Sequence, residues 1–229
     1  MPSVLITGAN RGIGLELARQ YAEDDWHVHA TARALESATD LKAVAGTVSH
    51  YALDVKDRAA IRQLAENITT PMDLVIANAG ISGRSESGGM PGTVGALDYE
   101  SWREVMEVNL FGAVATCEAF LPHVEKTKGT IVAISSQLAS NANAFLGSYS
   151  YNSSKAALNM AMNLMAIELK PKDIAVGTLH PGWVQTDMGG KQAPVSPADS
   201  AKGLKQVIAG LKPSERAHFV DFMGSTHPW

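Results

Sequence analysis

Short, continuously apolar segments alternate with longer amphipathic segments along this chain. The apolar segments cover residues 4–7, 28–31, 74–78, 130–135 and 175–179, and the helical segments cover residues 13–23, 98–126, 151–169 and 197–211. Strands that are apolar throughout, rather than at every second position, are typical of a parallel sheet covered on both faces. The pattern therefore predicts an α/β fold, a doubly wound parallel sheet with helices on both faces.

The distribution of Pro and Gly along the chain favours one domain. No linker rich in Pro and Gly divides the alternation, so we expect a single domain over residues 1–229. Residues 82–95 are rich in Gly and Ser and are expected to form a loop. Ser101 and Glu104 fit a capping box at the start of the long fourth helix, and Pro197 suits the first turn of the last one.

Composition narrows the class of function. The net charge of −4 argues against nucleic acid as the main partner. Cys117 is the only cysteine, so no intrachain disulfide can form, and its apolar neighbours favour a buried thiol over a nucleophile. The first residues enter a strand without the pattern of a signal peptide, and no apolar run approaches the length of a spanning helix. We expect a cytoplasmic protein that does not use a membrane as partner.

A glycine turn follows the first strand directly. Residues 7–14 read Thr-Gly-Ala-Asn-Arg-Gly-Ile-Gly and lead into a helix. Glycines in this context allow a tight turn and a close approach to a pyrophosphate at the helix N-terminus. The spacing is Gly-x-x-x-Gly-x-Gly, so it differs from the usual dinucleotide fingerprint. A glycine-rich loop without a ligand is the alternative, but the strand-turn-helix context favours a dinucleotide.

The end of the second strand indicates which dinucleotide binds. An acidic side chain there would bind a ribose hydroxyl, but this chain has Arg33 and no acid. Arg33 can pair with a 2′-phosphate, and Arg11 in the glycine turn can reach the same region from the other side. Both arginines favour NADP(H), unless they are solvated surface residues. Asp54 and Val55 are expected beside the adenine, although Asp54 also suits a turn.

Tyr151 and Lys155 lie four positions apart in a predicted helix and therefore on one face of it. A tyrosine has an ordinary pKa near 10, and a neighbouring ammonium would lower it by stabilising the phenolate. Chance can supply such a spacing, so the pair gains weight only from the motifs around it. Tyr149 is a weaker candidate, because Ser153 stands four positions after it.

Taken together, these motifs resemble the short-chain dehydrogenase/reductase family over nearly the whole chain. The glycine turn, residues 78–80 (Asn-Ala-Gly), the pair Tyr151 and Lys155, and residues 180–188 with their Pro-Gly step occur in the family's order. Length, the Ser135-Ser136 step and residues 224–229 are most similar to the small carbonyl reductases of the sniffer and C-factor type. The resemblance implies a single NAD(P)-binding Rossmann domain.

The resemblance also implies site residues. It places further catalytic groups at Asn109, an unfavourable residue inside a helix, and at Ser136, with Ser135 and Ser140 as alternatives. Many relatives have the serine about two residues later, where this chain has Leu138. The implied cofactor-binding residues are Gly8, Asn10, Arg11, Gly12, Ile13, Gly14, Arg33, Asp54, Val55, Asn78, Ala79, Gly80, Tyr151, Lys155, Pro181, Gly182, Val184, Thr186 and Met188.

The expected reaction is NADPH-dependent reduction of an aldehyde, ketone or quinone, with Tyr151 as general acid, Lys155 tuning it and Ser136 bonding the carbonyl oxygen. Asn109 would hold a water connecting Lys155 to solvent. A short segment after Met188 suggests a shallow pocket edged by Trp183, Phe145 and Met188, unless these residues belong to the core.

Two other functions stay open: a dinucleotide-binding sensor of C-factor type with little turnover, and an NAD-dependent alcohol dehydrogenase. The seven histidines show no metal-ligand spacing, so no metal is expected. A homodimer or homotetramer could form through the long central helices, and a monomer is equally open.

Overall fold

Seven strands form one parallel sheet in the computed structural model, which describes residues 1–83, 94–142 and 148–229. The strands are β1 (Ser3–Ile6), β2 (His27–Ala32), β3 (Val48–Ala52), β4 (Leu74–Ala77), β5 (Thr130–Ile134), β6 (Ala175–His180) and β7 (His218–Asp221), in the order β3-β2-β1-β4-β5-β6-β7. The strand order reverses direction between β1 and β4, and ligands bind at the carboxyl ends of strands beside such a reversal.

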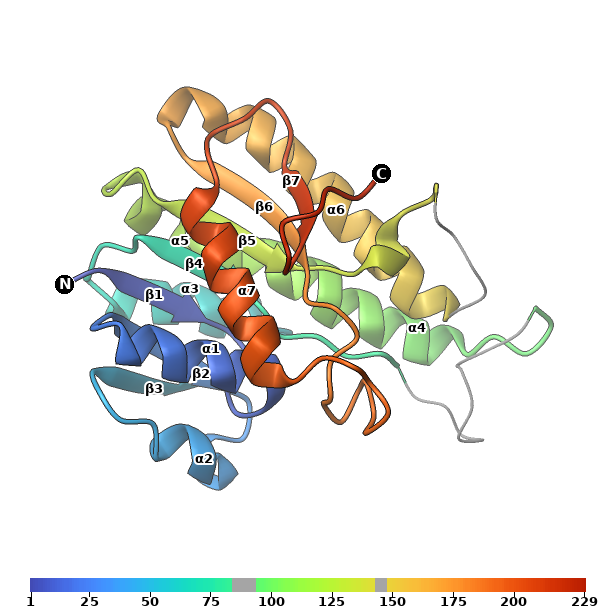
Figure 1. Ribbon diagram of the computed structural model, residues 1–229, viewed down its shortest axis with the longest axis horizontal. Coiled ribbons are helices and arrows are strands. Elements are labelled where there is room, and N and C mark those ends of the chain that lie inside the picture. Colours follow the sequence, from blue (N-terminus) through green and yellow to red (C-terminus); the bar gives the residue numbers. More distant parts are fainter. Residues whose placement is uncertain (84–93, 143–147) are drawn as a thin grey trace.

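Helices cover both faces of the sheet (Figure 1). The helices α1 (Gly12–Glu23) and α7 (Pro197–Gly210) pack together on one face. The other face carries α3 (Arg58–Asn67), α5 (Ala113–Glu125) and α6 (Tyr149–Leu169). The remaining short elements are α2 (Thr39–Lys42), α4 (Tyr99–Met106), a π-helical segment η2 (Glu107–Gly112), and the 3-10 turns η1 (Leu35–Ser37), η3 (Gln137–Ala139) and η4 (Lys170–Lys172).

Two apolar cores follow from this layering. Alternate residues of one strand enter different cores: Leu5 of β1 packs with α3, α5 and α6, whereas Val4 and Ile6 pack with α1 and α7. All three side chains are fully buried. Strand positions are therefore apolar on both sides, as the continuous apolar runs predicted. The doubly wound α/β fold is confirmed. Cys117 of α5 is fully buried in the core, and burial raises the pKa of its thiol to about 12.

The helix expected over residues 98–126 consists of three parts, α4, η2 and α5, which continue directly into one another. Its N-cap is Asp98, whose carboxylate accepts from the Ser101 N–H at 2.9 Å. The capping box expected at Ser101 and Glu104 is therefore wrong. The helix begins at Tyr99, before Ser101, and Asp98 takes the N-cap position expected for Ser101. Pro197 does lie in the first turn of α7.

Several elements were not expected from the sequence. These elements are β3, α3 and β7, and β3 and β7 lie at the two edges of the sheet, where no residue of β3 and only alternate residues of β7 are buried. The loop expected at residues 82–95 falls largely outside the described residues.

The segment after β7 turns back along this edge strand. Val220 and Thr226 form an antiparallel bridge, and the His227 N–H donates to the Phe219 carbonyl at 2.9 Å. The segment then crosses toward the turn after β5, where the Ala142 N–H donates to the backbone oxygen of Trp229 at 3.3 Å. The polar groups of β7 are thus partly occupied by the chain itself.

Among the described residues, one helical stretch, Tyr99–Glu125, is long and apolar enough to cross a membrane by length and composition. It comprises α4, η2 and α5, and 44% of its most apolar window is buried in the fold. A core helix passes the same test, so this stretch is weak evidence for a membrane span.

Candidate active site

The N-terminus of α1 is open to an anion. Arg11 occupies the N-cap with no side-chain bond to the helix, and the first turn has no acidic residue. By contrast, α3, α4, α6 and α7 are each capped by a side chain, from Asp57, Asp98, Ser148 and Ser196. The free N–H groups and the positive end of the helix dipole therefore suit a phosphate at the glycine turn.

Close backbone packing explains the glycines of this turn. A Cβ at Gly14 would lie 2.4 Å from the Gly8 carbonyl oxygen and 2.5 Å from Nδ2 of Asn78. Gly8 itself has φ of +66°, which favours glycine. The Asn78 amide donates to the carbonyls of Thr7, at 2.9 Å, and Gly8, at 3.1 Å. The ends of β1 and β4 are thereby joined beneath the helix.

Thr7 adds to this connection and was not singled out by sequence analysis. Its hydroxyl accepts from the N–H groups of Asn78, at 3.0 Å, and Ala79, at 3.1 Å. Its position at the end of a buried strand gave no sequence signal for a bond to a residue seventy positions away.

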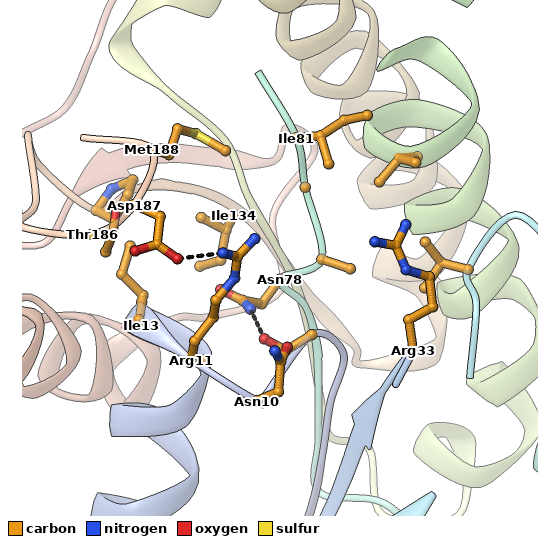
Figure 2. A pocket seen from close by; sticks show the side chains of 18 of the residues that line it. Asn10, Arg11, Ile13, Arg33, Asn78, Ile81, Ile134, Thr186, Asp187 and Met188 are labelled. Atoms are coloured by element: carbon orange, nitrogen blue, oxygen red, sulfur yellow. Dashed lines mark hydrogen bonds and ion pairs between the residues drawn. The ribbon is translucent and has the colours of Figure 1, made fainter. Parts of the chain in front are cut away.

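A cavity of about 660 Å³ runs from this turn to Tyr151 and Lys155. Figure 2 shows its walls, with the glycine turn, the end of β2 and the segment after β6 around one space. The expected site residues that line it are Gly8, Asn10, Arg11, Gly12, Ile13, Gly14, Arg33, Asp54, Val55, Asn78, Ala79, Gly80, Tyr151, Lys155, Pro181, Thr186 and Met188.

Two expected cofactor contacts lie outside the cavity lining. Gly182 packs against the Phe222 ring in a turn with φ of +87°. Val184 is buried, and its backbone forms a β-bridge with Val195. Their role in the structure is to hold the segment after β6 in place. The cavity is also lined by Ser135, the alternative catalytic serine, and by residues not expected from the sequence: Ala34, Leu53, Ile81, Val108, Ile134, Gln185, Asp187 and Pro197. Most have ordinary apolar side chains, which carry no motif.

The two arginines lie on opposite sides of the cavity (Figure 2). Arg33 follows β2, as expected. Arg11 forms an ion pair with Asp187 in the protein alone, and its expected contact with a 2′-phosphate near Arg33 stays a prediction. Asp54 accepts from the Lys56 N–H at 2.9 Å, which is the turn role left open above, and it also lines the cavity.

Lys155 lies beside Tyr151, as the helical spacing predicted. Its Nζ is 5.8 Å from the centroid of the Tyr151 ring and donates to the Ile134 carbonyl at 2.7 Å. Lys155 is only 4% exposed, and burial lowers its pKa to about 8.

The expected lowering of the Tyr151 pKa is not what the structure shows. Burial raises the pKa of this phenol, and a hydrogen bond with Ser136 opposes the rise. The physical reason is that Lys155 is buried and Tyr151 is half-buried, and loss of water disfavours phenolate and ammonium alike. Tyr151 therefore stays protonated in the protein alone.

Ser136 is the serine that contacts Tyr151. It has an extended backbone at the N-cap of η3, and its hydroxyl accepts from the Leu138 N–H at 3.1 Å. The hydroxyl of the alternative, Ser135, donates to Oδ1 of Asn159 at 2.6 Å in the core. Ser140 is buried at the end of η3. This geometry favours Ser136.

Asn109 is fully buried in the π-helical segment η2. Its Oδ1 accepts from the Ile81 N–H at 2.8 Å, and its Nδ2 donates to the Ile81 carbonyl, at 2.8 Å, and to Ser154 Oγ, at 3.0 Å. A Cβ at Gly80 would lie 3.3 Å from Asn109 Oδ1 and 3.5 Å from Lys155 Nζ, so the glycine keeps the two side chains next to one cavity wall.

The expected rim of the pocket is only partly described. Met188 lines the cavity, Trp183 is 55% exposed and bonds the Gly189 carbonyl, and Phe145 lies outside the described residues. Tyr149 is the first residue of α6 and does not line the cavity. Within the part of the chain that the structure describes, no three His, Cys, Asp or Glu side chains are placed to hold a metal ion.

Comparison with known proteins decides the family. The family model of the short chain dehydrogenases matches residues 2–195, which include the glycine turn, Asn109, Ser136, Tyr151 and Lys155. The chain is a short-chain dehydrogenase. The motif resemblance in the sequence is thereby confirmed.

The proteins similar to this short-chain dehydrogenase include C-signal and carbonyl reductases. C-signal of Myxococcus xanthus is 38% identical over 172 residues, covering 74% of this chain and all of that protein. The carbonyl reductase Sniffer of D. melanogaster superposes with a TM-score of 0.91 at 29% identity over both full chains. The NADPH-bound carbonyl reductase from chicken fatty liver gives 0.90 at 30% identity, covering 100% of this chain and 99% of that one.

Proposed function

We propose that this short-chain dehydrogenase is an NADPH-dependent carbonyl reductase in which Tyr151 is the general acid. The carrying observation is that Tyr151 and Lys155 line a cavity that also reaches the open helix N-terminus of the glycine turn, and that Ser136, just outside the lining, bonds Tyr151. A dinucleotide bound at the turn would extend toward Tyr151. The substrate carbonyl would lie between the nicotinamide and the phenol.

The site fits a dinucleotide phosphate. The uncapped α1 N-terminus and the space kept by Gly8 and Gly14 suit the pyrophosphate, and Arg33 at the end of β2 suits a 2′-phosphate. NADPH, when bound, supplies the hydride for the carbonyl carbon. The similarity to the carbonyl reductase from chicken fatty liver, which was crystallised with NADPH bound, supports the same cofactor.

The chain's own residues would handle the proton. The raised pKa keeps Tyr151 in its acid form, ready to give its proton to the carbonyl oxygen as negative charge develops there. Ser136, already bonded to the phenol, would donate to the same oxygen and hold it in line. Lys155 would bond the nicotinamide ribose. The second lone pair of Asn109 Oδ1 could accept from a water between Lys155 and solvent.

The substrate proposal is coarser. Ile81, Val108 and Met188 give the cavity apolar wall. They favour an apolar aldehyde, ketone or quinone over a charged one, because unpaired charge is costly against an apolar wall.

Tyr151→Phe tests the assignment. The variant should lose NADPH oxidation by at least about a hundredfold, since general acid catalysis contributes that much, while keeping the NADPH Kd close to that of the original protein. The measurement is NADPH oxidation over a panel of aldehydes, ketones and quinones, with binding followed by fluorescence. Tyr149→Phe is the matched control, because this tyrosine lies outside the cavity and should keep full turnover. Unchanged turnover in Tyr151→Phe would refute the role.

A sensing function is the second candidate, because of the similarity to C-signal. NADPH binding without turnover of any carbonyl would favour it. An NAD-dependent alcohol dehydrogenase is the third candidate, and an NADH Kd well below the NADPH Kd would favour it over the reductase.

Assembly and location belong to the same proposal. Met160, Leu164 and Ile167 of α6 and Phe111 of η2 are large apolar side chains about half exposed. They support a homodimer or homotetramer through the central helices, which light scattering would distinguish from a monomer. A cytoplasmic location remains our expectation, and localisation of a tagged protein would test it.

A further inference from the structure

An ion pair joins two distant segments across the mouth of the cofactor cavity. The Arg11 guanidinium of the glycine turn contacts the Asp187 carboxylate of the segment after β6, 176 positions later (Figure 2). Both residues line the cavity, and their side chains are 68% and 75% exposed. The pair is accessible to an incoming cofactor.

The backbone on both sides of the pair is fixed. A Cβ at Gly12 would lie 3.1 Å from Thr186 Cγ2, so the two segments already touch next to the pair. Thr186 also closes the turn around Asp187, since its hydroxyl accepts from the Gly189 N–H at 3.1 Å and its carbonyl from the Gly190 N–H at 2.8 Å. Breaking the ion pair therefore requires only side-chain rotation.

Among the charged residues around the cavity, Arg11 is the one for which a carboxylate and a cofactor phosphate would compete. The described cationic lining residues are Arg11, Arg33 and Lys155, and the anionic ones are Asp54 and Asp187. Lys155 is buried at the far end, and Asp54 bonds a backbone N–H. An exposed pair of single charges is weak, whereas a phosphate monoester carries nearly two negative charges and offers three oxygens to a guanidinium.

We propose that Asp187 sets cofactor selectivity: it holds Arg11 in the protein alone and releases it to the 2′-phosphate when NADPH binds. This inference rests on the proposed function. Asp187 competes with the 2′-phosphate for one arginine, so it weakens NADPH binding more than NADH binding.

A double-mutant cycle tests the competition. The NADPH and NADH Kd values are measured by fluorescence for the original chain, Asp187→Asn, Arg11→Gln and the double variant. Asp187→Asn should tighten NADPH binding about two- to fivefold, the range expected from an exposed ion pair. It should tighten NADH binding by a smaller factor, because NADH has no 2′-phosphate and only its pyrophosphate can interact with the released Arg11. In the Arg11→Gln background, Asp187→Asn should change the NADPH Kd and the NADH Kd by the same factor.

Asp173→Asn is the matched control, because Asp173 forms a similarly exposed ion pair with Lys128 and does not line the cavity. It should leave both Kd values unchanged. Weaker NADPH binding by Asp187→Asn, or equal changes in the NADPH and NADH Kd values, would overturn the role of Asp187 and leave the proposed function standing. If the original chain bound no NADPH, the proposed function would fall with it.

Discussion

Gly14 is the residue at which the fold and the cofactor site depend most directly on each other. It lies where α1 packs tightly against the end of β1, within the first turn of a helix whose N-terminus has no side-chain cap. A side chain there would meet the Gly8 carbonyl and the Asn78 amide, both of which belong to rigid strand ends. One methyl group would therefore disturb structure and binding together.

Gly14→Ala should destabilise the protein by about 1–3 kcal/mol, as overpacking does, and abolish measurable NADPH binding because the turn must open. Urea unfolding and a fluorescence titration would show both effects. Gly210→Ala, at the end of α7 with no atom within 4 Å of the added Cβ, is the control and should leave binding unchanged. Normal NADPH affinity in Gly14→Ala would contradict this role of the glycine.

Single residues were predictable where a local pattern identified them. The glycine turn and the helical spacing of Tyr151 and Lys155 are readable from neighbouring letters, and the structure places both at one cavity. Thr7 and Asp187 were missed because their partners are distant in sequence. The direction of the Tyr151 pKa was wrong, because burial cannot be judged from spacing alone.

The π-helical segment η2 is the element that shapes the active site. Its backbone hydrogen bonds span one residue more than those of α4 and α5 on either side, and such segments often occur at functional sites. Asn109 lies within it and bonds both backbone groups of Ile81, which follows β4. The segment therefore fixes the loop that forms one wall of the cavity.

Asn109→Ala should lower the free energy of unfolding by about 1–3 kcal/mol, because the Ile81 N–H and carbonyl would lose their partner where water has poor access. It should also reduce turnover, since the cavity wall at Ile81 and Lys155 loosens. Asn67→Ala is the control: this exposed side chain at the end of α3 accepts from Gln63, and its loss should change stability by less than about 0.5 kcal/mol. Equal urea midpoints for the two variants would argue against the role of η2.

Elements were predictable in proportion to their burial. The central strands and long helices have strong apolar patterns, and their predicted ends agree with the structure within about two residues. The π-helical segment was not predicted, because no local residue pattern marks the change in backbone hydrogen-bond spacing over residues 107–112. The edge strands β3 and β7 were missed because solvent covers part of each.

At the scale of the whole molecule, two buried histidines link stability to pH. His29 of β2 is 2% exposed and His180 of β6 is 8% exposed. Burial lowers the pKa of each ring to about 4, with smaller contributions from neighbouring histidines. In the unfolded chain each ring would titrate near 6.5.

The protein should lose stability as the pH falls from about 6.5 to about 4. Over this range the unfolded chain binds protons that the folded protein excludes, so the free energy of unfolding falls by up to a few kcal/mol. Above pH 6.5 both states are neutral at these rings and the effect disappears. Urea midpoints at pH 7.5, 6, 5 and 4.5 would measure the slope. The double variant His29→Gln, His180→Gln should flatten it, and an unchanged slope would rule these rings out.

The return of residues 225–229 along β7 limits how copies of this molecule can associate. An uncovered strand at a sheet edge invites pairing with another chain and, through repetition, fibre growth. Here the bridge of Val220 to Thr226 and the bond from His227 to Phe219 already occupy that edge. Pairing of another strand with this part of β7 is therefore hindered by the chain itself, which favours self-association through the other edge or the helical surfaces.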